Sequence, residues 1–266
     1  MAKIRLDTFL VESGLCESRE KAKSYIMSGL VFVEGQRVDK PGMQVDPLSN
    51  VILKDEGNQY VSRGAYKLIK ALDSFSVSPE GKSCIDFGAS TGGFTEVLLK
   101  NGARKVYAVD VGYGQLAWKL RKDDRVCVME RTNARHLGRK DFPEDIDFAV
   151  MDLSFISLEL VLPAVNEIVN DGADVICLIK PQFEAGREFV SRKGVVHDPK
   201  VHEQVIFKFM HFAAELGLIP LGLTYSPIKG PAGNIEFLIR LSKGAKANTR
   251  ISINEVVSLA HEELDQ

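Results

Sequence analysis

The alternation of short apolar runs with helical segments, from residue 83 onward, restricts the fold more than any other feature of this sequence. Several of these runs are apolar almost throughout, and most lead into a segment with helical spacing. Strands of this kind, each followed by a helix, are typical of a parallel sheet covered on both faces. The sequence therefore predicts an α/β, doubly wound, Rossmann-like sheet. Its expected strands are residues 83–89, 105–112, 125–131, 147–154 and 174–181.

The sheet is expected to close with an antiparallel hairpin. Residues 218–227 and 235–243 have strand composition, and the loop between them contains Pro and Gly. Before the hairpin, a long helix is predicted to begin at Pro199, because Asp198 can accept a hydrogen bond as its N-cap.

A terminal helix is predicted from Ser252. Ser252 and Glu255 have the spacing of a capping box, in which each side chain bonds a backbone N–H of the first turn. We expect this helix to pack on the larger domain through one apolar face, made of Ile253, Val256, Val257, Ala260 and Leu264.

The first part of the chain has a different organisation. Residues 5–54 predict two short helices followed by strands, and the polar stretch DEGNQY at 55–60 is typical of a linker. We therefore expect a small α+β domain at 1–58, a linker at 59–64 and a larger domain at 65–266.

Composition is that of a folded protein, with 45% hydrophobic and 26% charged residues. The four cysteines, Cys16, Cys84, Cys127 and Cys177, form no CxxC pair, so we expect free thiols in a reducing cytoplasm. The N-terminus carries Asp7 and no long apolar core, unlike a secretory signal. No apolar window reaches the roughly 20 residues of a membrane helix, so no membrane partner is expected.

Charge is unevenly distributed along the chain. Residues 59–140 hold 15 Lys+Arg against 8 Asp+Glu, whereas the whole chain has a net charge of −2. A basic segment in an otherwise acidic chain indicates a polyanionic partner, or alternatively a solvated charged face.

The glycine-rich stretch GASTGG, residues 88–93, follows the first apolar strand and matches neither the dinucleotide fingerprint nor the phosphate loop. Asp86 precedes it, and Asp110 ends the next strand. Carboxylates repel phosphate but suit an ammonium group and ribose hydroxyls. S-adenosylmethionine has both groups and no phosphate. The stretch therefore predicts a site for S-adenosylmethionine, with a ligand-free tight turn as the alternative.

Four charged residues occupy positions where a sheet or its edge favours apolar ones: Lys67, Asp152, Lys180 and Glu236. Strand ends at the carboxyl edge of an open α/β sheet line ligand clefts, so we expect these side chains to meet. Two lysines with two carboxylates suit the activation of a weak nucleophile such as a ribose hydroxyl. A lysine would act as a base or stabilise a developing alkoxide. Surface ion pairs are the alternative.

Several segments resemble the TlyA, or hemolysin A, group of ribosomal RNA 2′-O-methyltransferases, which is related to the FtsJ-type ribose methyltransferases. They include SRGAYKL, DFGASTGGFTEVLL, MDLSFIS, LIKPQFEAGRE and GPAGNIEFL. The resemblance implies a catalytic tetrad at the four charged residues and a cytidine target. No metal is expected, because the cysteines lack the spacing of a zinc knuckle. The resemblance also implies cofactor contacts from Gly88, Ala89, Ser90, Thr91, Gly92, Gly93, Phe94, Asp110 and Asn133. For Asn133, capping of the next turn is an equal alternative.

The N-terminal segments RLDTFLVESGL and SREKAKSYIMSGLVFVEG resemble the small alpha-L RNA-binding domain. This resemblance implies that ribosomal RNA or ribosomal subunits are the partner. Candidate RNA contacts are Arg5, Arg19, Lys21, Lys23 and Arg63. Three other functions remain open at this point: a non-catalytic RNA-binding protein, a small-molecule methyltransferase and a membrane-active hemolysin. The last would need a membrane-active segment, which the sequence does not show.

Overall fold

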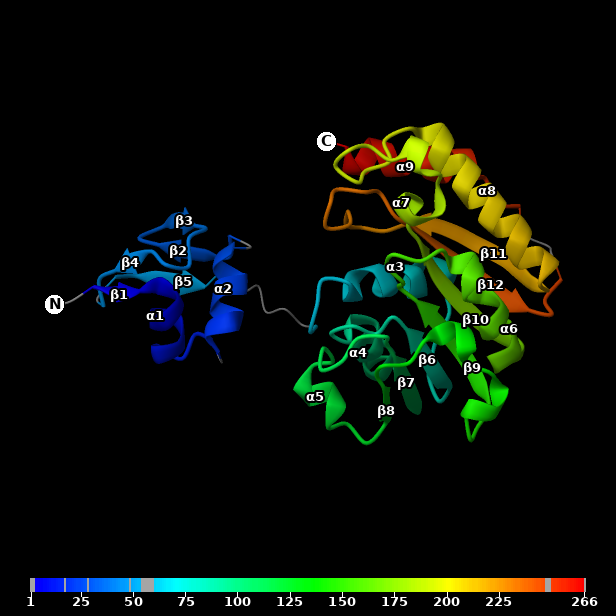
Figure 1. Cartoon of the computed structure of the whole chain (residues 1–266), viewed down its shortest axis with the longest axis horizontal. Helices are drawn as coiled ribbons and strands as arrows, with labels where there is room; N and C mark the ends of the chain where they lie inside the picture. Colours follow the sequence, from blue (N-terminus) through cyan, green and yellow to red (C-terminus); the bar gives the residue numbers. More distant parts are fainter. Residues whose placement is uncertain are drawn as a thin grey trace. The chain divides into compact units, whose positions relative to one another are not determined.

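The computed structural model describes residues 3–16, 18–27, 29–47, 49–53, 60–246 and 250–265. The chain divides into two compact units, Met1–Gln59 and Tyr60–Gln266 (Figure 1). Residues 54–59, which include most of the polar stretch 55–60 and the first residue of the expected linker, lie outside the described residues. Val61 belongs to the larger unit, where its N–H donates to Glu96 Oε2 at 2.6 Å. The linker at 59–64 stays a prediction.

The first unit has the two helices and the strands that its sequence predicts. Its helices pack on each other around a small apolar core that contains Leu6, Leu10 and Ile26. A three-stranded antiparallel sheet has the order β3-β2-β5, and β1 pairs with β4. The bounds are β1 Ile4–Arg5, α1 Leu6–Glu12, α2 Arg19–Met27, β2 Val31–Val33, β3 Gln36–Val38, β4 Gln44–Val45 and β5 Val51–Leu53.

The second unit contains a seven-stranded sheet with the order β11-β12-β10-β9-β6-β7-β8. The strands are parallel except β12, which is antiparallel to both of its neighbours. This arrangement confirms the doubly wound sheet and the closing hairpin. The bounds are β6 Ser83–Phe87, β7 Lys105–Val109, β8 Val126–Met129, β9 Ile146–Met151, β10 Val169–Ile179, β11 Leu218–Tyr225 and β12 Phe237–Lys243.

Helices cover both faces of this sheet, as Figure 1 shows. Alternate residues of a strand point to opposite faces, so Cys84 belongs to the apolar cluster that includes α3 and α4, while Ile85 and Phe87 belong to the cluster that includes α6, α8 and α9. Among the described residues, every helix is too short or too polar to cross a lipid bilayer. The helices are α3 Ala65–Phe75, α4 Gly93–Lys100, α5 Trp118–Arg121, α6 Leu162–Ile168, α7 Pro181–Glu184, α8 Pro199–Glu215 and α9 Ile253–Leu264.

Local predictions had mixed outcomes. Asp198 accepts from the Lys200 N–H at 2.9 Å, which confirms the N-cap of α8. The capping box of α9 was wrong, because the Ser252 side chain makes no capping hydrogen bond within the described residues. Strand β10 begins five residues earlier than expected, since the chain passes through Gly172 at φ +81° and a register irregularity before Asp174. The four cysteines are free thiols.

Candidate active site

The loop between β6 and α4 is shaped by contacts within the chain. A Cβ on Gly88, which has φ +85°, would lie 2.5 Å from the backbone carbonyl oxygen of Asp152. A Cβ on Gly92 would overlap the Leu120 side chain, and one on Gly93 would overlap the Ser62 hydroxyl. These glycines are therefore required by close packing of the chain.

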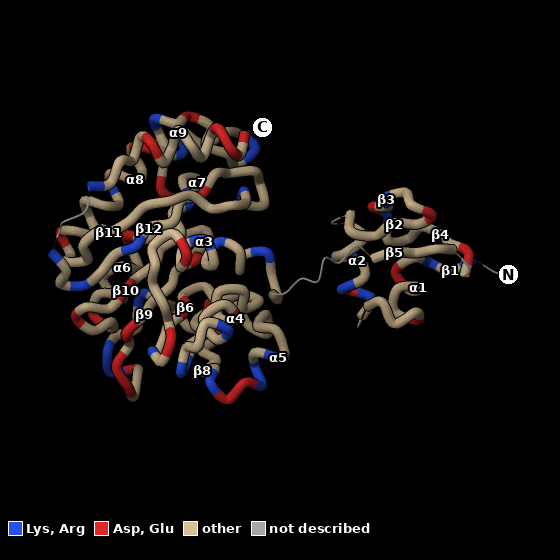
Figure 2. The backbone as a smooth tube through the Cα atoms, turned by 180° about the vertical axis from the view of Figure 1, so that it is seen from behind, with Lys and Arg blue, Asp and Glu red and all other residues tan. Residues whose placement is uncertain are grey.

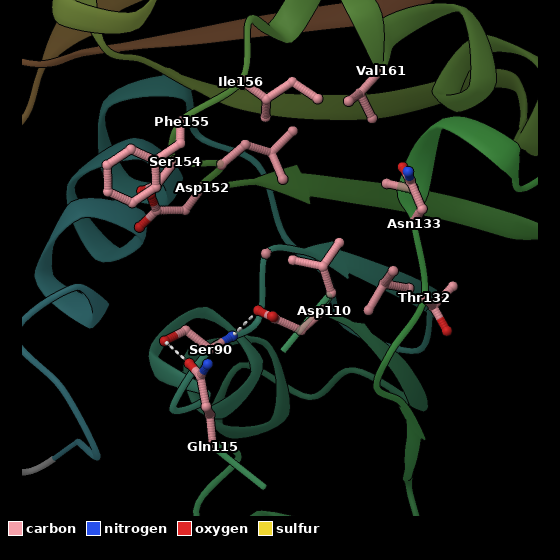
Figure 3. A pocket seen from close by; sticks show the side chains of 15 residues that line it. Ser90, Asp110, Gln115, Thr132, Asn133, Asp152, Ser154, Phe155, Ile156 and Val161 are labelled. Carbon is pink, nitrogen blue, oxygen red and sulfur yellow. Dashed lines mark hydrogen bonds between the residues drawn. The ribbon is translucent and has the colours of Figure 1, made fainter. Parts of the chain in front are cut away.

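A cavity of about 380 Å³ lies beside this loop at the carboxyl edge of the sheet (Figure 3). Asp110 and Ser90 line one side of it, and the segment 152–156 lies across from them. The two Asp110 carboxylate oxygens accept backbone N–H groups, Oδ2 from Ser90 at 2.8 Å and Oδ1 from Gly112 at 2.6 Å. These two hydrogen bonds fix the carboxylate at the cavity wall, where its remaining lone pairs can accept hydrogen bonds from hydroxyl groups.

Asn133 fits both of its alternatives. Its Oδ1 accepts from the Arg135 N–H at 3.1 Å and so caps the 3-10 turn Ala134–His136. The residue also lines the 380 Å³ cavity. Capping and a place at the cavity wall are thus compatible.

Asp86 is buried beneath the loop, and it is not a lining residue of this cavity. Its Oδ2 accepts from the Thr95 hydroxyl at 2.6 Å, whereas Oδ1 has no hydrogen-bond partner among the described residues. Burial raises the pKa of Asp86 to about 7. A buried carboxylate oxygen without a donor is a place where an ammonium group would bind.

The four charged residues form two ion pairs, one buried and one partly buried. Lys67 Nζ lies 2.6 Å from Glu236 Oε2, and Lys180 Nζ lies 2.6 Å from Asp152 Oδ1. Lys67 lies in α3. Asp152 directly follows β9, Lys180 directly follows β10, and Glu236 directly precedes β12. The alternative of surface ion pairs does not fit these contacts, since the exposed fraction of each lysine is only 7%.

The Lys180–Asp152 ion pair meets the glycine-rich loop through Asp152. A smaller cavity of about 210 Å³ is lined by loop residues 88–91, 93 and 94 together with Ser62, Gly64 and Asp152. A Cβ on Gly64, at the start of α3, would lie 4.0 Å from Asp152 Oδ2. Asp152 also lines the larger cavity, so it stands between the space for a ligand and the Lys180 amine.

Sequence reasoning missed several residues of the site. Ser154 Oγ accepts a hydrogen bond from Lys180 Nζ at 2.8 Å. Phe155 is 91% exposed at φ +64°, and its ring centre lies 5.2 Å from that of Phe183. Ser154 and Phe155 both follow Asp152 in the segment MDLSFIS. Neither residue is charged, so neither was predicted as part of the site. Ser62, Gln115 and Thr132 also line the cavities.

The predicted RNA contacts in the first unit include an organised cluster. Asp7 is fully buried and accepts hydrogen bonds from Arg5, at 3.0 and 2.8 Å, and from Arg19 at 3.3 Å. The pKa of Asp7 is lowered to about 2, and the hydrogen bonds from Arg5 are the largest cause. Lys21 and Lys23 are exposed on α2, where Figure 2 shows basic positions. Arg63 is exposed in the second unit.

Comparison with known proteins matches both units. Residues 60–243 match the FtsJ-like methyltransferase family, and residues 4–52 match the S4 domain. YqxC of Bacillus subtilis is 54% identical over 90% of this chain and 85% of its own length. The 16S/23S rRNA (cytidine-2′-O)-methyltransferase TlyA of Mycobacterium tuberculosis is 46% identical over 90% of each chain.

A solved structure of a hemolysin-named protein from Streptococcus thermophilus covers 100% of this chain and 98% of its own, with 49% identity and a TM-score of 0.78. The agreement thus extends over both units rather than over the sheet alone. The chain belongs to the FtsJ-like methyltransferase family, within the TlyA and hemolysin A group that carries an N-terminal S4 domain.

Proposed function

We propose that this protein transfers a methyl group from S-adenosylmethionine to a ribose 2′-oxygen of ribosomal RNA, with cytidine as the target nucleoside. The observation that carries the proposal is the set of two ion pairs, Lys67 with Glu236 and Lys180 with Asp152, of which Asp152 lines the glycine-rich cavity. The relative from Mycobacterium tuberculosis, whose name states this activity, supports it.

The cavities fit S-adenosylmethionine, whose sulfonium supplies an activated methyl carbon. Asp110 would accept the ribose hydroxyls and Asp86 Oδ1 the ammonium. Ser90, Asn133 and the backbone of residues 88–94 would line the ligand. The carboxylates favour this ligand over a nucleotide, because they repel phosphate groups.

Lys180 would activate the ribose hydroxyl, and its neighbours would orient it. Asp152 and Ser154 hold the Lys180 amine at 2.6 and 2.8 Å. Lys67 would contribute a second positive charge, and Glu236 fixes that lysine. Alignment of the hydroxyl with the methyl carbon can supply about 7 to 11 kcal/mol of the barrier.

The S4 unit would dock the enzyme on folded RNA. Arg5 and Arg19 are held side by side by the buried Asp7 and keep exposed side chains, at 46% and 52%. Lys21 and Lys23 on α2, and Arg63 in the second unit, would add phosphate contacts. Such contacts fix position on structured RNA without reading its sequence. An enzyme that acts on ribosomal subunits would work in the cytoplasm. Its two domains would be residues 1–58 and 65–266, joined by a linker at 59–64.

The function is tested by incubating the protein with radiolabelled S-adenosylmethionine and isolated, unmodified small and large ribosomal subunits. We expect label on a ribose 2′-oxygen after digestion to nucleosides. Protein that binds the cofactor but labels neither subunit would contradict the proposal. Label on a base instead of a ribose would show that the reaction is wrong.

Replacing Asp86 by asparagine should weaken S-adenosylmethionine binding by about tenfold or more, since hydrogen bonds to charged groups contribute about 1.5 to 3 kcal/mol. The wild-type affinity should rise with pH between 6 and 7.5, because the Asp86 pKa of about 7 leaves the carboxyl protonated at the lower end. Isothermal titration calorimetry measures both effects.

The matched control is Asp174→Asn, which changes a buried carboxyl that pairs with Lys82 and Arg240 in the middle of β10. It should leave the affinity within twofold of wild type. An Asp86→Asn protein with wild-type affinity at pH 7.5 would show that Asp86 has no contact with the ligand.

A further inference from the structure

The loop between β11 and β12 ends at Glu236 and is fastened at its base by Asn234. Asn234 is 1% exposed. Its Oδ1 accepts from the Val196 N–H at 3.0 Å, and its Nδ2 donates to the Gly194 carbonyl at 2.8 Å. The side-chain amide therefore holds a separate loop, residues 194–196, against the segment that carries Glu236.

The same loop is tightly folded around Glu236. The Gly230 N–H donates to the Asn234 carbonyl at 2.9 Å. A Cβ on Gly230 would lie 2.5 Å from Glu236 Oε1, so the Glu236 carboxylate rests against the loop backbone. A displacement of Asn234 would thus move the wall on which this carboxylate lies.

A second set of contacts fastens the loop at Lys229. Lys229 Nζ lies 2.7 Å from Asp265 Oδ1, and Asp265 Oδ2 lies 2.7 Å from His261 Nδ1. His261 Nε2 lies 3.0 Å from His202 Nδ1, and His202 Nε2 lies 3.1 Å from the Val196 carbonyl oxygen. Because the Val196 N–H donates to Asn234, this series of contacts returns to the loop between β11 and β12 and forms a closed ring. We call these five side chains the polar ring: Lys229, Asn234, His202, His261 and Asp265.

The polar ring needs one proton more than two neutral imidazoles carry. The Val196 carbonyl and the Asp265 carboxylate accept only, and the contact between the imidazoles needs one further N–H. Three N–H groups are therefore required, whereas two neutral rings supply two. Burial and, after it, the neighbouring His261 lower the pKa of His202 to about 4, which favours its neutral form. Asp198 and Asp265 are the carboxylates that face the pair.

We infer that the polar ring, with Asn234 as its central member, is a positioning device for Glu236 and, through Glu236, for the Lys67 amine. Asn234 touches neither cavity, so it is a positioning residue and has no direct contact with substrate. The inference rests on the proposed function, because it assigns Asn234 to the Lys67–Glu236 pair of that reaction. A small displacement of a reacting group lowers a rate steeply, which is why an indirect contact matters.

The first test compares Asn234→Ala with wild type in methyl transfer to ribosomal subunits. We expect kcat to fall about tenfold or more, as two hydrogen bonds are lost, while the Kd for S-adenosylmethionine stays within twofold. Asn166→Ala is the matched control, since Asn166 donates to the Leu216 carbonyl at 3.0 Å on another part of the fold. It should keep kcat within twofold.

Two further variants keep the inference testable if Asn234→Ala does not fold. Asn234→Asp retains the acceptor for Val196 and loses the donor to Gly194, so its kcat should lie between those of wild type and Asn234→Ala. Asp265→Ala opens the ring at a side chain that is half exposed and should lower kcat about threefold. Its control is Glu215→Ala, which removes a partner of His211 at the same spacing on α8.

The outcomes separate the inference from the proposed function. Inactive wild-type protein overturns both. Active wild type with Asn234→Asp and Asp265→Ala at wild-type kcat overturns the inference alone. Equal losses in the two ring variants and the two controls also overturn it, because they show that general destabilisation slows the enzyme. A loss of kcat in the ring variants only supports positioning.

Discussion

Replacing Lys180 by alanine should lower kcat for methyl transfer by a factor of about 1,000, the usual size of a lost acid–base or charge-stabilising group. The amine is 7% exposed and is held by Asp152 and Ser154 at the edge of the ligand cavity. Alanine removes it and leaves the Asp152 carboxylate without its cation. The Kd for S-adenosylmethionine should change little, because Asp152 stands between the larger cavity and the Lys180 amine.

Single-turnover methyl transfer and calorimetry measure these two quantities on the same protein. Lys82→Ala is the matched control, since Lys82 pairs with Asp174 at the far end of the sheet. It should retain wild-type kcat. Substantial activity in Lys180→Ala would rule out the role that we propose for this amine.

Lys180→Arg distinguishes the two ways in which the lysine can act. Arginine keeps the charge but cannot give up a proton at any working pH. If Lys180 accepts the hydroxyl proton, the arginine protein will be as inactive as the alanine protein. If the charge stabilises the developing alkoxide, the arginine protein will keep a measurable part of kcat.

Gly88→Ala should reduce the free energy of unfolding by roughly 3 kcal/mol or more. A left-handed backbone with a Cβ costs about 1 to 2 kcal/mol, and overlap in a packed interior adds about 1 to 3 kcal/mol. The overlap here is with the Asp152 carbonyl, 2.5 Å from the new Cβ, so the backbone that carries Asp152 must shift. Methyl transfer should therefore fall together with stability.

Gly217→Ala separates strain from overlap. Gly217 has φ +84°, nearly the same as Gly88, but a Cβ there meets no atom within 4 Å. Urea unfolding of both proteins should show a loss of only about 1 to 2 kcal/mol for Gly217→Ala. Equal losses in the two variants would show that the approach of Asp152 to the loop has no energetic consequence.

The sequence predicted the sheet because its strands are apolar runs of the right length, and β12 was recognised from its Pro- and Gly-containing loop. It also brought together Lys67, Asp152, Lys180 and Glu236, since charged residues at strand ends are unusual. The pairing itself was not predictable. Which lysine meets which carboxylate depends on strand order, and Lys67 and Glu236 are 169 positions apart.

Other features of the site have no local signal at all. The requirement for Gly88 depends on the Asp152 carbonyl, which only the adjacency of β6 and β9 brings near. Asn234 looks like an ordinary loop residue, and its partners are 38 and 40 positions away. The α9 capping box failed for the opposite reason: a local signal was present, but the Ser252 side chain makes no capping hydrogen bond in the folded chain.

The place of β12 in the sheet has a consequence for synthesis of the chain. The residues that line the two cavities lie between 62 and 161, so the cofactor pocket is encoded in the first two thirds of the sequence. Glu236 arrives only with β12, which inserts between β10 and β11 after both have been made. A chain emerging from the ribosome can therefore form its ligand pocket well before it can perform chemistry. Prematurely terminated products should bind the cofactor at most, and leave the ribosomes around them unmodified.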